Sequence, residues 1–121
     1  MSLRTDRVAS LVKEEAGLYI SREMNDPAVG LITVMEVQMT PDLKIAKIYV
    51  SVLGKLGTKE AALEMLEARK GELRSHLGSV IRLKFTPSIQ FYLDETMERV
   101  DKINRLLYQI HKDDAPKTDE S

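Results

Sequence analysis

LITVMEVQMTPDLKIAKIYVSVL, residues 31–53, carries two strand patterns separated by a turn signal. In residues 31–39 alternate positions are expected on opposite faces of a strand. One of these faces should carry Leu31, Thr33, Met35, Val37 and Met39. Residues 45–53 alternate in the same way between apolar and more polar side chains. The intervening Thr-Pro-Asp-Leu at 40–43 favours a tight turn, because Pro presets φ and Asp bonds its own downstream backbone. The stretch therefore predicts a β-hairpin.

An isolated hairpin is barely stable in water, so the remaining segments must cover its apolar face. Residues 4–23 predict an amphipathic helix, because apolar side chains recur there at helical spacing. Its expected buried stripe is Val8, Leu11, Val12, Ala16, Tyr19 and Ile20. Pro27 should end this helix, since the residue before a proline avoids the α-helical region.

The helical pattern is interrupted between residues 58 and 81. Thr58 is a candidate N-cap for a helix that carries Ala62, Leu63 and Leu66. The next turn should be apolar, yet Arg69, Lys70 and Gly71 occupy it, and a new stripe then begins. That new stripe is Leu73, Leu77, Val80 and Ile81. The pattern favours two helices that meet at a kink near Gly71 over a single continuous helix.

The last third of the chain predicts one more strand and one more helix. Ile89, Phe91 and Leu93 alternate with polar residues, which indicates a strand. A helix is expected from Thr96 to Lys112, with one apolar face at Val100, Ile103, Leu107 and Ile110. We therefore expect one domain, residues 1–112, followed by a disordered acidic tail at 113–121.

This order of elements predicts an α+β two-layer sandwich, with helices on one face of a three-stranded sheet. The last strand follows a helical crossover, so it should run parallel to one hairpin strand. The 121 residues contain no cysteine and no apolar run long enough to cross a membrane. A cytoplasmic protein is the resulting expectation.

Catalytic and metal-binding signals are missing from the sequence. It contains no HExxH, Walker, GxGxxG or GxSxG motif. His76 and His111 fall in separate predicted helices, and His76 is expected to be a surface imidazole. We therefore expect no catalytic residue, no metal, no cofactor and no small-molecule substrate.

Basic residues gather where the helical pattern breaks. The net charge is only −1, but residues 69–84 contain five basic side chains against one acid, Glu72. A helix N-terminus favours phosphate, and a glycine there permits close approach of a sugar-phosphate backbone. KH domains clamp RNA with a comparable turn between two helices, usually GxxG, which is absent from residues 58–81 of this chain. A solvated helical face is the alternative interpretation of the cluster.

Several segments also carry a resemblance to a known family. They are Arg4-Thr5-Asp6-Arg7-Val8 with Glu15, Asp26-Pro27, Leu31-Ile32-Thr33-Val34 with Val37, Asp42-Leu43, AKIYVSVLG at 46–54, Gly71 with Arg74, Leu77-Gly78, IRLK at 81–84, Thr86-Pro87, Phe91 and Asp94. With these segments in this order, residues 3–110 resemble ribosome-binding factor A, a family of small bacterial proteins.

The resemblance implies a KH-like fold of type II, with αββααβ order and an extra C-terminal helix. It also implies non-catalytic binding to the small (30S) ribosomal subunit and its 16S rRNA. The implied task is late rRNA maturation that includes the 5′ end, often linked to growth in the cold. One departure lies at the kink, where the family usually has Ala-x-Gly and this chain has Arg69-Lys70-Gly71.

We expect a monomer that recognises the RNA backbone and its shape more than its bases. Phosphate contacts are expected around Gly71, with weaker candidates on the first helix and second strand. The candidate RNA-binding residues are Arg69, Lys70, Gly71, Arg74, Arg82, Lys84, Lys44, Lys47, Arg4 and Arg7. Two rival interpretations are a protein-interaction module that docks through the C-terminal helix and a small enzyme that uses Glu and His.

Overall fold

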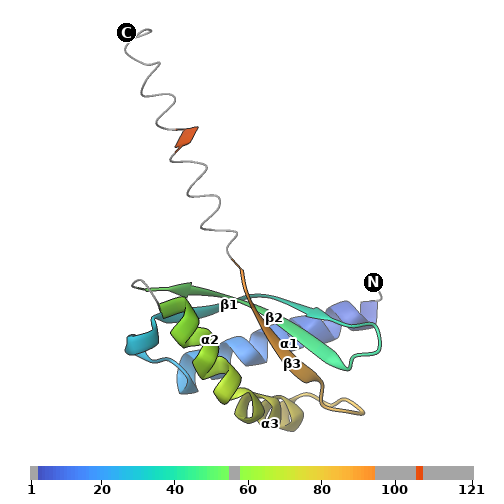
Figure 1. Ribbon diagram of the computed structural model, residues 1–121. Coiled ribbons are helices and arrows are strands. Elements are labelled where there is room, and N and C mark those ends of the chain that lie inside the picture. Colours follow the sequence, from blue (N-terminus) through green and yellow to red (C-terminus); the bar gives the residue numbers. More distant parts are fainter. Residues whose placement is uncertain (1–2, 55–57, 95–105, 108–121) are drawn as a thin grey trace.

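The computed structural model describes residues 3–54, 58–94 and 106–107. Three helices lie on one face of a three-stranded sheet, which confirms the predicted two-layer α+β architecture (Figure 1). The elements are α1 (Leu3–Glu23), the 3₁₀ turn η1 (Pro27–Val29), β1 (Leu31–Met39), β2 (Ile45–Leu53), α2 (Thr58–Ala68), α3 (Lys70–Val80) and β3 (Ser88–Leu93).

The sheet has the order β1-β2-β3, so the second strand of the hairpin is central. β1 pairs with it antiparallel and β3 pairs with it parallel, as the sequence predicts. The turn is held by Asp42, whose Oδ1 accepts hydrogen bonds from Thr40 Oγ1 at 2.7 Å and from the Lys44 amide at 3.0 Å. Leu43 takes a positive φ of 62° within this turn.

The predicted alternation of β1 is wrong over its first half. The pairing register shifts between Val34 and Glu36, so Met35 forms a one-residue bulge. A bulge adds one residue to a strand and thereby exchanges the faces on either side of it. The residues that face the helices are Ile32, Val34, Val37 and Met39. Leu31 and Thr33, which a regular alternation places on the same face as Val37, are exposed instead.

Helix α1 packs against the sheet through a narrow buried stripe, with one residue from each helical turn. The buried positions are Thr5, Val8, Val12, Ala16 and Ile20, which follow a spacing of three and four. Leu11, expected in this stripe, is 43% exposed, because the helix presents a narrow face to the sheet. Tyr19 is half-buried at the edge of the stripe.

Two helices, not one, connect β2 to β3. α2 ends at Ala68 and α3 begins at Lys70, so the break falls at Arg69, with φ −106° and ψ 12°. Gly71 lies inside the first turn of α3, two residues after the break. Val80 is 46% exposed, contrary to the expected core position, because α3 ends there and the chain turns away.

The core lies between this sheet and the helices. β2 contributes Ala46, Ile48 and Val50, and α2 and α3 contribute Leu66 and Leu73, all without exposed surface. The predicted helix from Thr96 to Lys112 and the acidic tail lie outside the described residues, apart from Leu106 and Leu107. Those two residues are helical and about half exposed. Within the described part of the chain, no helix has the length and apolar character needed to span a membrane.

Gly30 joins η1 to β1 at a position where only glycine fits. Its φ is +86°, and a Cβ would lie 2.6 Å from the carbonyl oxygen of Leu53. Gly30→Ala is therefore expected to lower the free energy of unfolding by about 2 kcal/mol or more, measured by urea denaturation. The control is Gly17→Ala in α1, where no atom lies within 4 Å and a gain of about 0.5–1 kcal/mol is expected. Similar losses in both variants would contradict this assignment.

Candidate nucleic-acid interface

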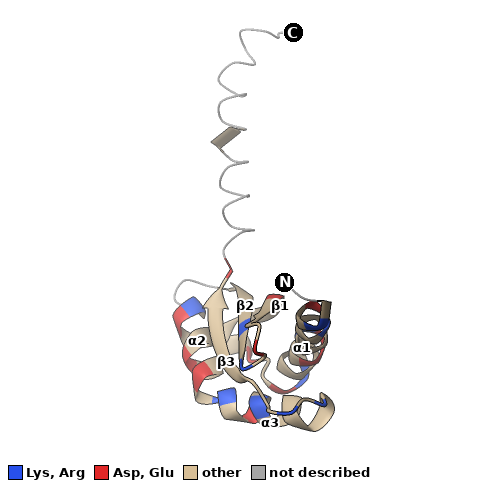
Figure 2. Ribbon diagram, turned by 90° about the vertical axis from the view of Figure 1, so that its right-hand side faces the viewer, with Lys and Arg blue, Asp and Glu red and all other residues tan. Residues whose placement is uncertain are grey.

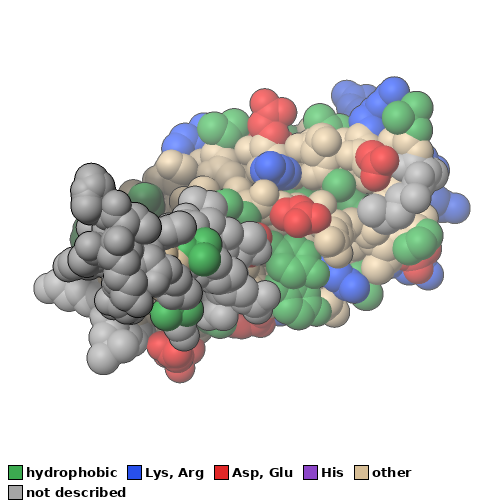
Figure 3. Space-filling model, turned by 90° about the horizontal axis from the view of Figure 1, so that it is seen from above, with side chains coloured by type: hydrophobic (Ala, Val, Ile, Leu, Met, Phe, Trp, Pro, Cys, Tyr) green, Lys and Arg blue, Asp and Glu red, His purple; other side chains and the backbone are tan. Residues whose placement is uncertain are grey.

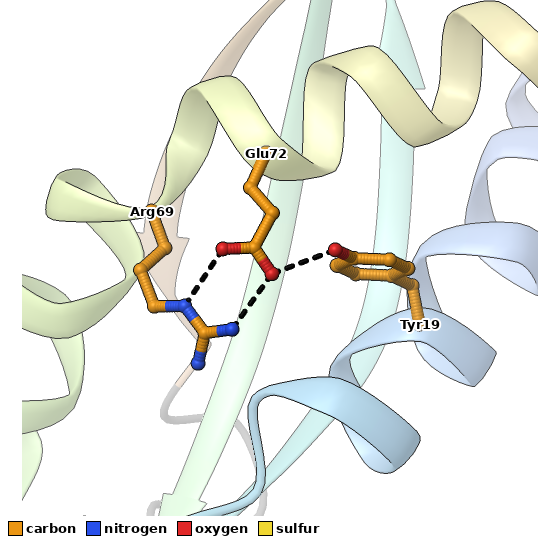
Figure 4. A network of polar contacts seen from close by, with 3 residues as sticks. All are labelled: Tyr19, Arg69 and Glu72. Carbon is orange, nitrogen blue, oxygen red and sulfur yellow. Dashed lines mark hydrogen bonds and ion pairs between the residues drawn. The ribbon is translucent and has the colours of Figure 1, made fainter.

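We call the junction of α2 and α3, residues 69–74, the elbow. The guanidinium of Arg69 makes two bonds to Glu72, from Nε to Oε1 at 3.0 Å and from Nη2 to Oε2 at 2.6 Å (Figure 4). Tyr19 of α1 donates its hydroxyl to the same Oε2 at 2.6 Å. The Glu72 carboxylate thus neutralises the charge of Arg69 and also links α3 to α1 through its hydrogen bond with Tyr19.

The pKa values at the elbow shift in the direction that this network requires. The hydrogen bonds from Arg69 and Tyr19 hold the pKa of the Glu72 carboxyl below its usual value. The hydrogen bond to Glu72 raises the pKa of Arg69, and the same carboxylate raises the pKa of the Tyr19 hydroxyl. All three groups therefore keep the protonation states in which they attract one another near neutral pH.

The other two elbow cations are also engaged. Lys70 Nζ lies 2.6 Å from Glu67 Oε1. Arg74 donates from Nε to the carbonyl of Pro87 at 3.1 Å and from Nη2 to the carbonyl of Thr86 at 3.0 Å. The structure gives each elbow cation a partner within the protein, and these partners lie on different elements: α3 for Arg69, α2 for Lys70 and the α3–β3 loop for Arg74.

His76 is not the surface imidazole that the sequence predicts. Its ring stacks on Tyr19, with the centroids 4.6 Å apart, and its side chain is only 19% exposed. The Nε2 atom lies 3.5 Å from Glu15 Oε1 and makes no hydrogen bond. The contact between α1 and α3 covers the ring, which helical spacing within one segment cannot reveal. In the described ranges, no cluster of acidic and histidine side chains has the composition of a metal site.

Five other candidate cations converge from three separate segments. The start of α1, the β1–β2 turn and the α3–β3 loop meet at one end of the molecule, which faces the viewer in Figure 2. We call this surface the basic end, formed by Arg4, Arg7, Lys44, Arg82 and Lys84. All five side chains are exposed. None of them forms an ion pair with any residue in the described part of the chain.

The basic end is hollowed in two places. A pocket of about 290 Å³ lies between the β1–β2 turn and the α3–β3 loop, and a groove of about 710 Å³ lies between α1 and the end of α3. Arg4 and Leu83 line both. Phe85 at the pocket is 64% exposed, with Lys84 Nζ 5.6 Å from the centre of its ring. The surface therefore combines unpaired cations with accessible apolar side chains.

Lys47 lies apart from both clusters, on the open face of the sheet. It stands between Gln38 of β1 and Gln90 of β3 in the pairing register. The next row of this face holds Tyr49 and Tyr92, whose rings stack with centroids 5.3 Å apart. Figure 3 views this face, with side chains of the hydrophobic class, which includes tyrosine, near its middle.

Two aromatic side chains, Phe85 and Tyr92, reach solvent. For Tyr92 the sequence contains the signal, because it alternates with Phe91 and Leu93 in a strand with one buried face. Phe85 gives no comparable signal, since it belongs to a loop.

The arrangement of helices and strands defines a class of protein. Helices on one face of a β1-β2-β3 sheet, with α2 and α3 joined at a sharp break, make a KH-like α+β domain. The family model described as ribosome-binding factor A matches residues 4–107. The chain therefore belongs to the ribosome-binding factor A family.

Solved structures agree with this fold. The crystal structure of ribosome-binding factor A from Thermus thermophilus is 22% identical, with a TM-score of 0.65 over 74% of this chain and 94% of that one. An NMR structure of a Thermotoga maritima protein proposed to be a ribosome binding factor A is 26% identical, with a TM-score of 0.62 over 76% and 88%. A Thermus thermophilus homology model fitted into a cryo-EM map of a 30S complex is 23% identical, with a TM-score of 0.62 over 72% and 91%.

The lowered pKa of Glu72 predicts a pH dependence of stability. The folded protein binds this proton more weakly than the unfolded chain does, so the stabilisation is complete above the ordinary pKa of 4.5 and is lost as the pH falls through the folded value. Thermal unfolding from about pH 6 to about pH 3 should show that Glu72→Gln loses less stability than the wild type.

The matched control for this measurement is Glu64→Gln, which changes an exposed carboxylate of α2. This variant should keep the wild-type dependence on pH. If Glu72→Gln also followed the wild-type curve, the network of Tyr19, Arg69 and Glu72 would contribute nothing to the fold in solution.

Proposed function

We propose that this protein binds the small ribosomal subunit through its rRNA and assists late maturation of 16S rRNA, including the 5′ end, without catalysis. The observation that carries the proposal is the family match over residues 4–107. The Thermus thermophilus homology model fitted into a map of a 30S complex adds support. In this proposal the protein acts as a cytoplasmic monomer, supports growth in the cold, and needs no cofactor or small-molecule substrate.

The basic end is the surface that we propose for the main rRNA contact. Its five cations are exposed and unpaired within the described part of the chain, so a phosphate can be bound without breaking an existing ion pair. The elbow differs, because Arg69 and Lys70 would have to leave Glu72 and Glu67 first. Phosphate contacts position a protein on RNA, and their number sets the salt dependence of binding.

The elbow remains a second, weaker proposal. No side chain caps α3 at Arg69, and nothing within 4 Å blocks the surface above Gly71. An RNA backbone could therefore approach the first turn of α3 closely, where the helix dipole favours phosphate. Lys47 is proposed as a separate contact on the open face of the sheet, away from both clusters.

A protein partner that docks on the C-terminal segment is the second candidate function. The observation in its favour is that Leu106 and Leu107 are 53% and 48% exposed. If this contact were responsible for subunit binding, Leu107→Ser would weaken the association and changes at the basic end would not.

Charge reversal at the groove of the basic end tests the main proposal. Arg7→Glu combined with Arg82→Glu should weaken co-sedimentation with purified small subunits about tenfold or more, because two phosphate contacts become repulsive. The salt dependence of binding should also become shallower, by about one unit of slope for each phosphate that is no longer neutralised.

The matched control reverses two exposed cations elsewhere on α1, Lys13→Glu with Arg22→Glu, which produces the same change in net charge. Circular dichroism should show both double variants folded, since none of the four side chains is paired within the described residues. Equal loss of binding in the two variants would show that only the total charge matters, and would remove the basic end as a specific surface.

Gly71→Ala tests the elbow separately from its cations. The new methyl group has no neighbour within 4 Å, so the free energy of unfolding should rise by about 0.5–1 kcal/mol. Co-sedimentation should nonetheless weaken, because the methyl group holds the RNA backbone away from α3. A more stable variant that binds subunits as the wild type does would remove the elbow from the interface.

A further inference from the structure

We propose that the pocket of the basic end takes a single unpaired nucleotide, with its phosphate on the surrounding cations and its base on Phe85. The inference rests on the proposed binding to rRNA and gives that contact a specific chemistry. Three cations from three segments, Arg4, Lys44 and Lys84, line this one pocket. Because the fold brings these segments to one pocket, all three charges attract a phosphate bound there.

Phe85 is the first reason to expect a base. A large apolar ring that is 64% exposed on a loop is shielded from water only when something flat or apolar covers it. The pocket beside it measures about 290 Å³, near the lower end of the range of about 300–1,000 Å³ for small-ligand sites. That size suits one nucleotide and is too small to enclose a helical duplex.

Asp42 is the second reason, because a site for phosphate alone would not contain a carboxylate. Its Oδ1 already accepts hydrogen bonds from the Thr40 hydroxyl and the Lys44 amide, which fix the side chain at the pocket wall. These donors also lower the pKa of the Asp42 carboxyl, so it stays ionised near neutral pH. The other oxygen can accept a hydrogen bond from the exocyclic amine of a base, as carboxylates do with N4 of cytosine.

An exposed ring beside a fixed carboxylate favours single-stranded RNA over a duplex. In an RNA duplex both faces of each base are stacked, so Phe85 could not stack on one, and the major groove that exposes N4 of cytosine is too deep and narrow for Asp42 to enter. An unpaired base exposes one face for the phenyl ring and its edge for the carboxylate. A base with an exocyclic amine, such as cytosine, should bind more tightly than uracil, which has none.

The elbow offers no equivalent arrangement among the described residues, because its cations already have partners in the protein and its aromatic neighbour, Tyr19, is bonded to Glu72 and stacked on His76. On the open face of the sheet, the stacked Tyr49 and Tyr92 each give one ring face to the other. Their hydroxyl groups lie near Gln38 and Gln90, so this pair is less available than Phe85. The pocket is therefore the place where cations, an exposed ring and a fixed acceptor coincide.

Fluorescence anisotropy with labelled oligonucleotides tests the inference on the full chain. The probes are a short single-stranded oligocytidylate, an oligouridylate of the same length and an RNA duplex of the same length. The wild type should bind oligocytidylate most tightly. Phe85→Leu should weaken that binding about tenfold, and Phe85→Tyr should restore it, because stacking requires an aromatic ring.

Two further variants separate the parts of the site. Asp42→Asn keeps an acceptor for the turn, since asparagine forms the same local bonds, and should abolish the preference for cytosine over uracil. Tyr92→Leu is the matched control, because it removes an exposed aromatic ring outside the pocket, and should bind as the wild type does. Circular dichroism of each variant checks that the fold is retained.

Three results would overturn the inference. They are equal affinity for single strand and duplex, unchanged binding by Phe85→Leu, and displacement of the RNA by an oligoglutamate of equal charge as effectively as by unlabelled oligocytidylate. The last result would assign the pocket to acidic polymers in general, proteins included.

Subunit co-sedimentation distinguishes this failure from failure of the proposed function. If the wild type and Phe85→Leu sediment equally well with subunits, and the oligonucleotides show no preference, the nucleotide site is wrong while subunit binding stands. If the wild type does not sediment with subunits at all, the proposed function fails, and the oligonucleotide measurements decide the pocket on their own.

Discussion

Burial of one face of a three-stranded sheet is the constraint on which the rest of the structure depends. Ala46, Ile48 and Val50 on the central strand have no exposed surface, because α1, α2 and α3 all pack against that face. An antiparallel hairpin can leave its other face in water, but the parallel third strand needs a crossover. Here the two helices of that crossover help to form the cover. The same connection carries the α3–β3 loop to the end of the sheet where the hairpin turn and the start of α1 lie.

The sequence was sufficient for those elements whose signal is local. The hairpin, the end of α1 and the separation of α2 from α3 each follow from a pattern within one segment, and the parallel direction of the third strand follows from its helical crossover. The bulge at Met35 did not, because the alternation on either side of it is regular and only the pairing with β2 reveals the shift. Exposure of Leu11 and Val80 could not be predicted either, since it depends on how wide a face each helix buries.

The candidate site also contains some features that a single segment predicts and others that only the tertiary fold reveals. Counting charges located the cations of the elbow, and the spacing of Arg69 and Glu72 at three residues even contained the clue that they pair. The bonds from Arg74 to the Thr86 and Pro87 carbonyls join residues far apart in the sequence, so no count of charges could reveal them. Convergence of Arg4, Lys44 and Lys84 likewise requires the tertiary fold. Sequence proximity therefore favours the elbow cations, whereas the exposed cations without ion pairs in the described part of the chain, which we propose for the main RNA contact, lie at the basic end.

The guanidinium of Arg74 gives the α3–β3 loop a property that matters for any ligand beside it. Its two bonds fasten the backbone at Thr86 and Pro87 to the middle of α3, directly after Phe85. A side chain at Gly78 would meet the Thr86 hydroxyl at 2.8 Å, so the loop also lies tightly against the helix. This segment is therefore already ordered when the protein has folded, and little further conformational entropy is lost when a ligand binds beside it. Such preorganisation strengthens binding without any additional contact.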